Sequence, residues 1–154
     1  MSNTVLTKMK EGVLTITMNR PEALNALDRE LSETLQKTIV TAEQDKKVRC
    51  VVIRGGEQFM AGGDLKYFAE NLDCEPNEKR IMFEGFINQV HKIIISIRHM
   101  PKPVVASIRG PAAGFGLSLA MACDLAIAAD NAFFTLAYVN IGTSPDGGST
   151  FALP

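Results

Sequence analysis

The chain of 154 residues has no tryptophan, two histidines and three cysteines, and these shortages exclude several kinds of protein. A small, odd number of cysteines does not make a disulfide scaffold. Cys50 and Cys123 lie in apolar runs, which predicts buried free thiols of a reducing compartment. No metal site is expected, because no Cys-x-x-Cys or His-x-x-x-His spacing occurs. The polar first ten residues lack the apolar part of a signal peptide, and no stretch resembles a membrane span, so we predict a cytoplasmic protein.

Neither sign of charge is in excess, because 16 Lys and Arg stand against 17 Asp and Glu, for a formal net charge of −1. A generic nucleic-acid or membrane-surface binder needs a strong basic excess, so neither nucleic acid nor a membrane is an expected partner. Hydrophobic residues make up 46% of the chain, which is enough for a folded core. At this length we expect a single domain over residues 1–154.

Hydrophobic periodicity predicts strands that alternate with helices. Short apolar or alternating runs bounded by glycine or proline indicate strands, and apolar residues spaced three and four apart indicate helices. The expected elements are strands at 5–9 and 13–18, a helix at 28–44, a strand at 50–53 buried on both faces, a helix at 78–100, a strand at 104–108, a helix at 117–123, and strands at 125–129 and 133–135. This alternation predicts an α/β fold with mostly parallel strand pairing.

Two loops, Met60–Leu65 and Gly110–Gly116, are built mainly from small residues, and each is expected to lead from a buried strand into a helix. Small side chains let a ligand approach the backbone, and the free N–H groups of a helix's first turn attract negative charge. Taken alone, each loop is more often a tight turn than a ligand site. Neither loop has the Gly-Lys-Ser/Thr ending of a phosphate loop or a complete GxGxxG, so no nucleotide or nicotinamide site is expected.

Four segments together carry a family resemblance. Each is a weak signal alone, but their order and spacing along nearly the whole chain are specific. They are Asn19-Arg20-Pro21 with Asn25-Ala26-Leu27, Phe59–Leu65, Gly110–Ala120 with Cys123-Asp124, and Gly142–Gly148. With them the chain resembles the enoyl-CoA hydratase/isomerase (crotonase) superfamily. The resemblance implies a spiral of repeated ββα units. Residues 1–154 would be its N-terminal core, without the C-terminal helical region that covers the site and helps to form a homotrimer or a dimer of trimers.

The resemblance also implies a role in fatty acid metabolism, with an acyl-CoA thioester as substrate. No separate cofactor is implied, because coenzyme A is part of the substrate. In this superfamily two main-chain N–H groups stabilise the thioester enolate, and by position they belong to Gly63 and Phe115. Phe115 stands where many relatives have glycine, so its ring is expected to point away from the oxyanion. Substrate or CoA contacts fall by resemblance on Ala23, Leu24, Ala61, Leu65, Gly114 and Tyr138.

The acid–base groups distinguish the reactions of the superfamily. Hydratases use two glutamates, and the matching positions hold Ser118 and Tyr138, neither of which is an adequate base near neutral pH. Asp146 matches the catalytic acidic residue of isomerases, although Pro-Asp-Gly is also a turn sequence in its own right. We therefore expect an isomerase that shifts a double bond with Asp146 as the proton carrier. Two alternatives stay open: an enoyl-CoA hydratase (a lyase) with a reduced site, and a non-catalytic acyl-CoA-binding subunit.

Two charged residues lie within the same segments. Asp64 is expected to stabilise its turn through hydrogen bonds from its side chain to the backbone. Arg20 could contact the phosphates of CoA, or it could be a solvated surface charge.

Overall fold

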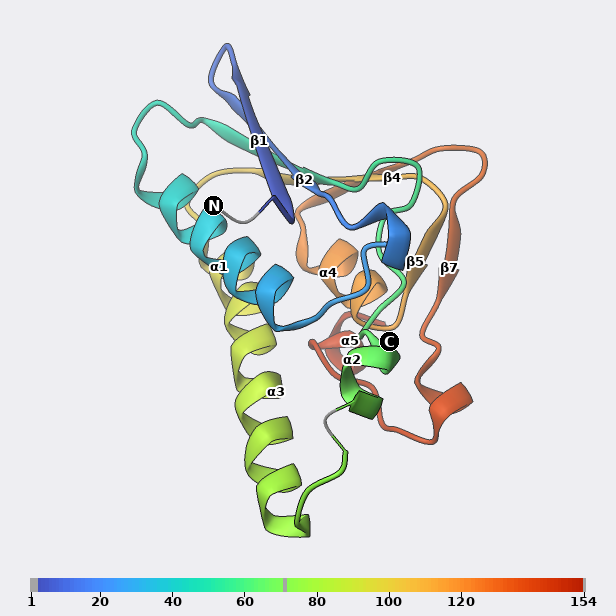
Figure 1. Ribbon diagram of the computed structural model, residues 1–154. Helices are drawn as coiled ribbons and strands as arrows, with labels where there is room; N and C mark the ends of the chain where they lie inside the picture. Colours follow the sequence, from blue (N-terminus) through green and yellow to red (C-terminus); the bar gives the residue numbers. More distant parts are fainter. Residues whose placement is uncertain (1–2, 71, 154) are drawn as a thin grey trace.

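The computed structural model describes residues 3–70 and 72–153, and its centre is a five-stranded sheet with the long helices on one face (Figure 1). The outer pair is an antiparallel hairpin, and the other three strands add to it in parallel. The strands are β1 (Val5–Lys10), β2 (Val13–Met18), β3 (Cys50–Arg54), β4 (Val104–Ile108) and β6 (Leu125–Ala128), in the order β1-β2-β3-β4-β6. This mostly parallel pairing, with helices between the strands, confirms the predicted fold class.

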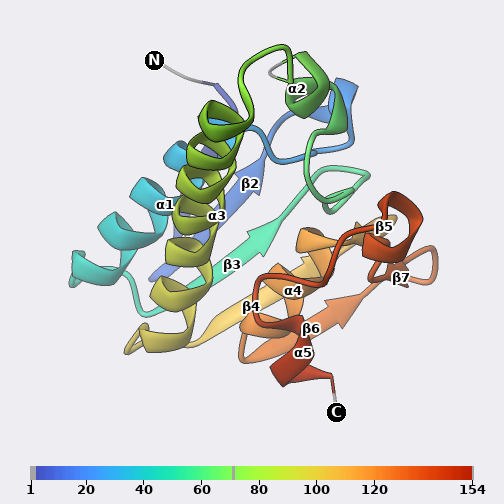
Figure 2. The ribbon, with the colours of Figure 1, turned by 90° about the horizontal axis from the view of Figure 1, so that it is seen from below.

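Three helices cover the sheet. The helices α1 (Arg29–Gln44) and α3 (Pro76–His99) lie side by side, and α4 (Phe115–Ala122) lies next to α3 (Figure 2). The side chain of Asp28 caps the start of α1, because its Oδ1 accepts a hydrogen bond from the N–H of Leu31 at 2.8 Å. In the described part of the chain, no helix is long and apolar enough to cross a membrane.

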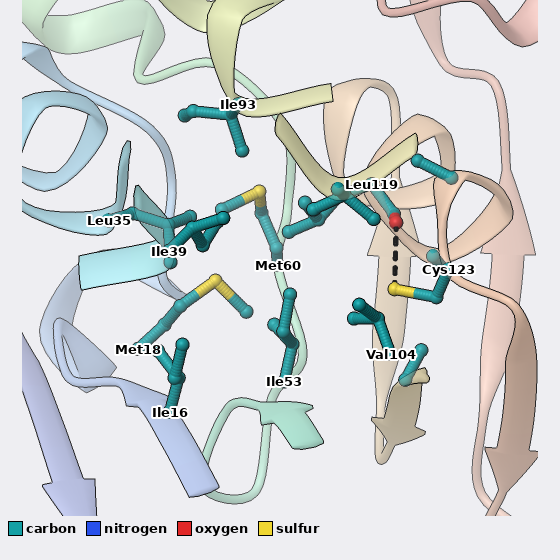
Figure 3. Close-up of a cluster of buried hydrophobic side chains, with 14 of the residues drawn as sticks. Ile16, Met18, Leu35, Ile39, Ile53, Met60, Ile93, Val104, Leu119 and Cys123 are labelled. Carbon is teal, nitrogen blue, oxygen red and sulfur yellow. Dashed lines mark hydrogen bonds between the residues drawn. The ribbon is translucent and has the colours of Figure 1, made fainter. Parts of the chain in front are cut away.

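The core forms between this helical layer and the inner face of the sheet (Figure 3). Side chains of a strand alternate between its two faces, so Ile16, Met18 and Ile53 point inward against Leu35 and other residues of the helices. These inward side chains are fully buried. The core therefore holds the starts of α1 and α4 in place relative to the strand ends.

No disulfide forms among the described residues, and Cys123 is the one buried cysteine there. Cys123 lies in the core, where its Sγ contacts the carbonyl oxygen of Leu119 at 3.3 Å (Figure 3). Burial and the neighbouring Asp124 raise the pKa of its thiol to about 12. Cys50 is half-buried, and so is Val52, because both lie on the outer face of β3. The predictions of a buried Cys50 and of a strand buried on both faces were therefore wrong.

Several short elements were not predicted. The segment expected to be a loop at 110–116 contains a short strand, β5 (Pro111–Ala113), which pairs in parallel with β7 (Phe133–Thr135) in a second, two-stranded sheet. The other elements that were not predicted are η1 (Pro21–Ala23), η2 (Tyr138–Ile141) and α5 (Ser149–Ala152), whereas α2 (Leu65–Glu70) is the helix into which the Met60–Leu65 loop was expected to lead. All of them are six residues or shorter, and most flank the candidate site described below.

Candidate active site

The two small-residue loops meet in the folded chain. Met60 forms an isolated parallel bridge with Ala112, in which the Met60 N–H donates to the Pro111 carbonyl at 3.0 Å and the Ala113 N–H donates to the Met60 carbonyl at 2.9 Å. Beyond the bridge the backbones approach so closely that a Cβ added to Gly62 would lie 3.1 Å from the Ala113 oxygen. The φ of Gly62 is +99°, so both the space and the backbone conformation favour glycine here.

Gly63 and Phe115 directly follow the two glycines at this contact, Gly62 and Gly114. A Cβ on either glycine would lie 3.7 Å from the Cα of the other. Phe115 is the first residue of α4, so its N–H has no acceptor within the helix. Within the described residues, 3–70 and 72–153, neither the N–H of Gly63 nor that of Phe115 donates a hydrogen bond. Both N–H groups are thus available to an external acceptor.

A cavity of about 770 Å³ lies beside these loops, and both Gly63 and Phe115 line it. The part of its lining that comes from α2 and α3 is apolar and consists of Phe68, Phe83, Phe86, Ile87 and Val90, together with Leu65. The Phe68 ring packs so closely on Gly63 that a Cβ there would lie 2.8 Å from its Cε2 atom. The cavity therefore combines two free main-chain donors with a large hydrophobic surface, an arrangement typical of small-molecule sites.

Asp146 is the one carboxylate among the described residues that line this cavity. It is half-buried, and its Oδ1 accepts a hydrogen bond from the hydroxyl of Tyr138 at 2.6 Å. The Tyr138 oxygen also lies 3.1 Å from Oγ of Ser118. Burial, followed by the hydrogen bond to Asp146, raises the pKa of Tyr138. The phenol is therefore a donor to the carboxylate, and not a base, at any pH near neutrality.

The side chain of Phe115 is buried, with 4% of its surface exposed. Its ring belongs to the core, and a Cβ added to Gly147 would lie 3.2 Å from the ring's Cδ2. The ring thus packs between the core and the loop that carries Asp146. The expectation that the ring points away from the oxyanion stays a prediction.

The first loop is held by an ionic cluster that involves Arg20. Its guanidinium lies 3.0 Å from Oδ2 of Asp64 and 3.2 Å from Oδ2 of Asp28, and it also donates to the carbonyl of Ala26. Oδ1 of Asp64 accepts hydrogen bonds from the N–H groups of Lys66 and Tyr67, which confirms its predicted structural role. Because two carboxylates hold Arg20, it is not a solvated surface charge, which corrects that expectation, and a contact with a CoA phosphate stays a prediction.

Acidification is expected to remove stability that ionised Asp64 contributes. Burial raises the pKa of Asp64, but the N–H of Tyr67 and the Arg20 guanidinium outweigh it, so the pKa is lowered overall. The contribution is therefore complete above the unfolded value of about 3.9 and is lost as the pH falls through the lower folded value. Urea unfolding of wild type and Asp64→Asn should show a variant less stable by about 1–3 kcal/mol at neutral pH. Its stability should fall less steeply below about pH 4; parallel pH curves would contradict this account.

The structure brings most of the predicted site residues together. The cavity lining includes Asp146, Gly63, Phe115, Ala61, Leu65, Gly114 and Tyr138. Ala23 and Leu24 lie outside this lining, at the end of η1, but the Leu24 carbonyl accepts a hydrogen bond from Ala61 at 3.1 Å and so adjoins the first loop. The apolar wall of the cavity was not predicted. The spacing of Phe83, Phe86, Ile87 and Val90 predicts a buried helix face, whether that face meets the core or a cavity.

A match to a known protein family identifies this fold. Residues 8–154 match the family model described as enoyl-CoA hydratase/isomerase. The chain belongs to this family. The four sequence segments therefore carried a true family signal, and the fold they implied is the one observed.

Individual relatives of this enoyl-CoA hydratase/isomerase chain have mixed names. The chain is 34% identical to 1,2-epoxyphenylacetyl-CoA isomerase of Escherichia coli K12 over 151 residues, and this alignment covers 97% of the chain and 56% of the relative. It is also 34% identical over 151 residues to the mitochondrial methylglutaconyl-CoA hydratase of Mus musculus, with 97% and 46% covered. The crystal structure of an enoyl-CoA hydratase from Polaromonas sp. JS666 superposes with a TM-score of 0.89 and 39% identity, over 97% of this chain and 57% of that one. The chain thus spans about half the length of the curated relatives it matches.

Proposed function

We propose that the protein is an acyl-CoA isomerase that moves a carbon–carbon double bond through a thioester enolate. The N–H groups of Gly63 and Phe115 would bind the thioester oxygen, and Asp146 would carry the proton. The observation that carries the proposal is that, among the described residues, Asp146 is the single carboxylate lining the cavity that also contains both free N–H groups. The apolar wall from α2 and α3 suits the acyl part of such a substrate.

The reaction balances with one acid–base group. The Asp146 carboxylate removes a proton from the α-carbon of a β,γ-unsaturated acyl-CoA, and the electron pair moves to the thioester oxygen as a dienolate. The two N–H groups stabilise the negative charge on that oxygen, helped by the N-terminus of α4. The protonated Asp146 then returns its proton to the γ-carbon, the carbonyl reforms, and the double bond lies between the α- and β-carbons. CoA is part of the substrate, so no separate cofactor enters.

Hydration is the main rival, since some relatives are named hydratases. It requires one group to activate water and another to protonate carbon, which is easier with two acid–base residues. By resemblance, the two glutamate positions of hydratases hold Tyr138, whose raised pKa disfavours a role as base, and Ser118, which has no activating base among its partners in the described part of the chain. These residues favour the isomerase over the hydratase with a reduced site.

Two substrates separate the candidate functions. The natural full-length protein is incubated with a β,γ-enoyl-CoA in deuterated water and, separately, with a trans-α,β-enoyl-CoA in ordinary water. An isomerase converts the first substrate and leaves the second without added water. Accumulation of a 3-hydroxyacyl-CoA without migration of the double bond would assign the protein as a hydratase. If calorimetry shows binding of either acyl-CoA and neither is turned over, the result would support the non-catalytic alternative.

A further inference from the structure

The hydroxyl of Tyr138 contacts one oxygen of the Asp146 carboxylate, and in the described part of the chain no side chain donates a hydrogen bond to the other oxygen. A phenol has one hydrogen to donate, and an ionised carboxylate can only accept, so the 2.6 Å contact is a hydrogen bond from Tyr138 to Oδ1. We infer that Tyr138 is a positioning residue that holds Oδ1 of Asp146, so that Oδ2 is the atom that takes and returns the migrating proton. This inference rests on the proposed isomerase function.

Ser118 lies within hydrogen-bond distance of both partners of this hydrogen bond, and its hydroxyl has one hydrogen to share between them. Its Oγ lies 3.1 Å from the Tyr138 hydroxyl and 3.1 Å from the main-chain oxygen of Asp146. It also lies 3.5 Å from the carbonyl of Gly114, the residue just before the second N–H donor. One buried serine thus links the loop of the base to the start of α4, so the carboxylate and the oxyanion donor have a common anchor.

The backbone beside Asp146 is equally constrained. Gly147 has a φ of +59°, and a Cβ there would lie 2.7 Å from the Cβ of Ser118. The Asp146 carbonyl also accepts hydrogen bonds from the N–H of Ser149 at 3.1 Å and from its Oγ at 3.0 Å. The main chain of Asp146 is therefore held from two sides, and its carboxylate by Tyr138. This explains why the position expected to carry a hydratase glutamate holds a tyrosine that does no acid–base chemistry of its own.

A held carboxylate has a kinetic consequence. A proton on Oδ2 leaves the Tyr138 hydrogen bond to Oδ1 intact, so the carboxyl group does not rotate between its two proton transfers. The same proton can then be returned to the γ-carbon before it exchanges with water. Without the hydroxyl, the carboxyl group rotates, and misplacement by about 1 Å costs on the order of 10²-fold in rate. Tyr138 should thus affect kcat and the retention of the transferred hydrogen, and not substrate affinity.

The test uses Tyr138→Phe in the natural full-length protein, with a β,γ-enoyl-CoA in deuterated water. We expect kcat to fall by about 10- to 100-fold with little change in KM. We also expect a smaller fraction of the product to carry, at its γ-carbon, the hydrogen that was removed from the α-carbon, because more of it exchanges with deuterium. Ser118→Ala should also lower kcat and the retention of the transferred hydrogen, but by a smaller factor. Tyr67→Phe is the matched control, because it removes the same atom from the other tyrosine, which does not line the cavity.

A second measurement does not depend on turnover or on the folding of Tyr138→Phe. In ¹³C NMR of tyrosine-labelled protein, the Tyr138 resonance should stay in its protonated position beyond pH 10, where an ordinary tyrosine is about half ionised. In Asp146→Asn it should titrate at lower pH, because the negatively charged acceptor is gone. An unchanged titration would overturn the hydrogen bond and the inference with it.

The outcomes separate this inference from the proposed function. If the wild type isomerises and Tyr138→Phe keeps its kcat and hydrogen retention, or changes only KM, the positioning role is wrong and the isomerase stands. If the wild type incorporates deuterium at the α-carbon without moving the double bond, the isomerase is wrong. Loss of that exchange in Tyr138→Phe would then still support the positioning of Asp146, and unchanged exchange would overturn it.

Discussion

Replacing Asp146 with asparagine is expected to lower kcat for double-bond migration by about 10²- to 10⁴-fold, the range for removal of a general acid–base group. The amide keeps the size of the side chain and can still accept a hydrogen bond from Tyr138, but it cannot remove a proton from the α-carbon. Affinity for the acyl-CoA should change little, since the apolar wall and the two N–H groups are untouched. Stopped-assay rates and calorimetric affinities of the two proteins measure both quantities.

Asp130→Asn is the matched control for this experiment. It makes the same chemical change in an exposed residue of the loop between β6 and β7, so activity and stability should stay at the wild-type level. If Asp146→Asn also kept wild-type turnover, Asp146 would be no more than the turn residue that Pro-Asp-Gly is in many proteins. The isomerase mechanism would then lack its proton carrier.

Elements with a long hydrophobic pattern could be predicted from the sequence. The helix that begins after Asp28 follows from its cap and its apolar stripe, and β4 follows from an apolar run closed by Pro103 and Arg109. In such elements local preference and tertiary packing agree, so a local signal is enough. The two glycine loops could also be predicted as tight turns before helices, because the small residues are visible in the sequence, but their role as a ligand site came only from the family resemblance.

What could not be predicted depends on contacts between distant residues. β5 is three residues long and exists because it pairs with β7, and its Ala112 also forms a bridge with Met60, 52 positions away. The hydrogen bond between Tyr138 and Asp146 joins the first residue of η2 to the loop that follows η2. The residues that flank η2, Ala137 and Gly142, both have left-handed backbone conformations. No periodic pattern describes such a path. The position of Tyr138 was noticed by resemblance, but the direction of its hydroxyl required the folded backbone.

The contact between the two loops also determines the outcome of a single methyl insertion at Gly116. A Cβ there would lie 2.3 Å from the carbonyl oxygen of Met60 and 2.9 Å from its Cβ. Met60 is fully buried and its carbonyl already accepts from Ala113, so neither side can move away cheaply. Gly116→Ala should therefore push α4 away from the first loop. Phe115, the residue before it, carries one of the two N–H donors, so the donors would no longer converge on one oxygen.

For Gly116→Ala we expect a loss of about 1–3 kcal/mol in unfolding free energy, as for other overpacked cores. We also expect a fall of about 10²- to 10³-fold in kcat, the effect of losing one oxyanion donor. Gly85→Ala is the control, because Gly85 is exposed within α3 and its added Cβ meets no atom within 4 Å. There alanine should raise stability by about 0.5–1 kcal/mol without affecting kcat. A folded Gly116→Ala protein with wild-type kcat would show that the reaction does not use the N–H of Phe115, because that donor cannot stay aligned when α4 shifts.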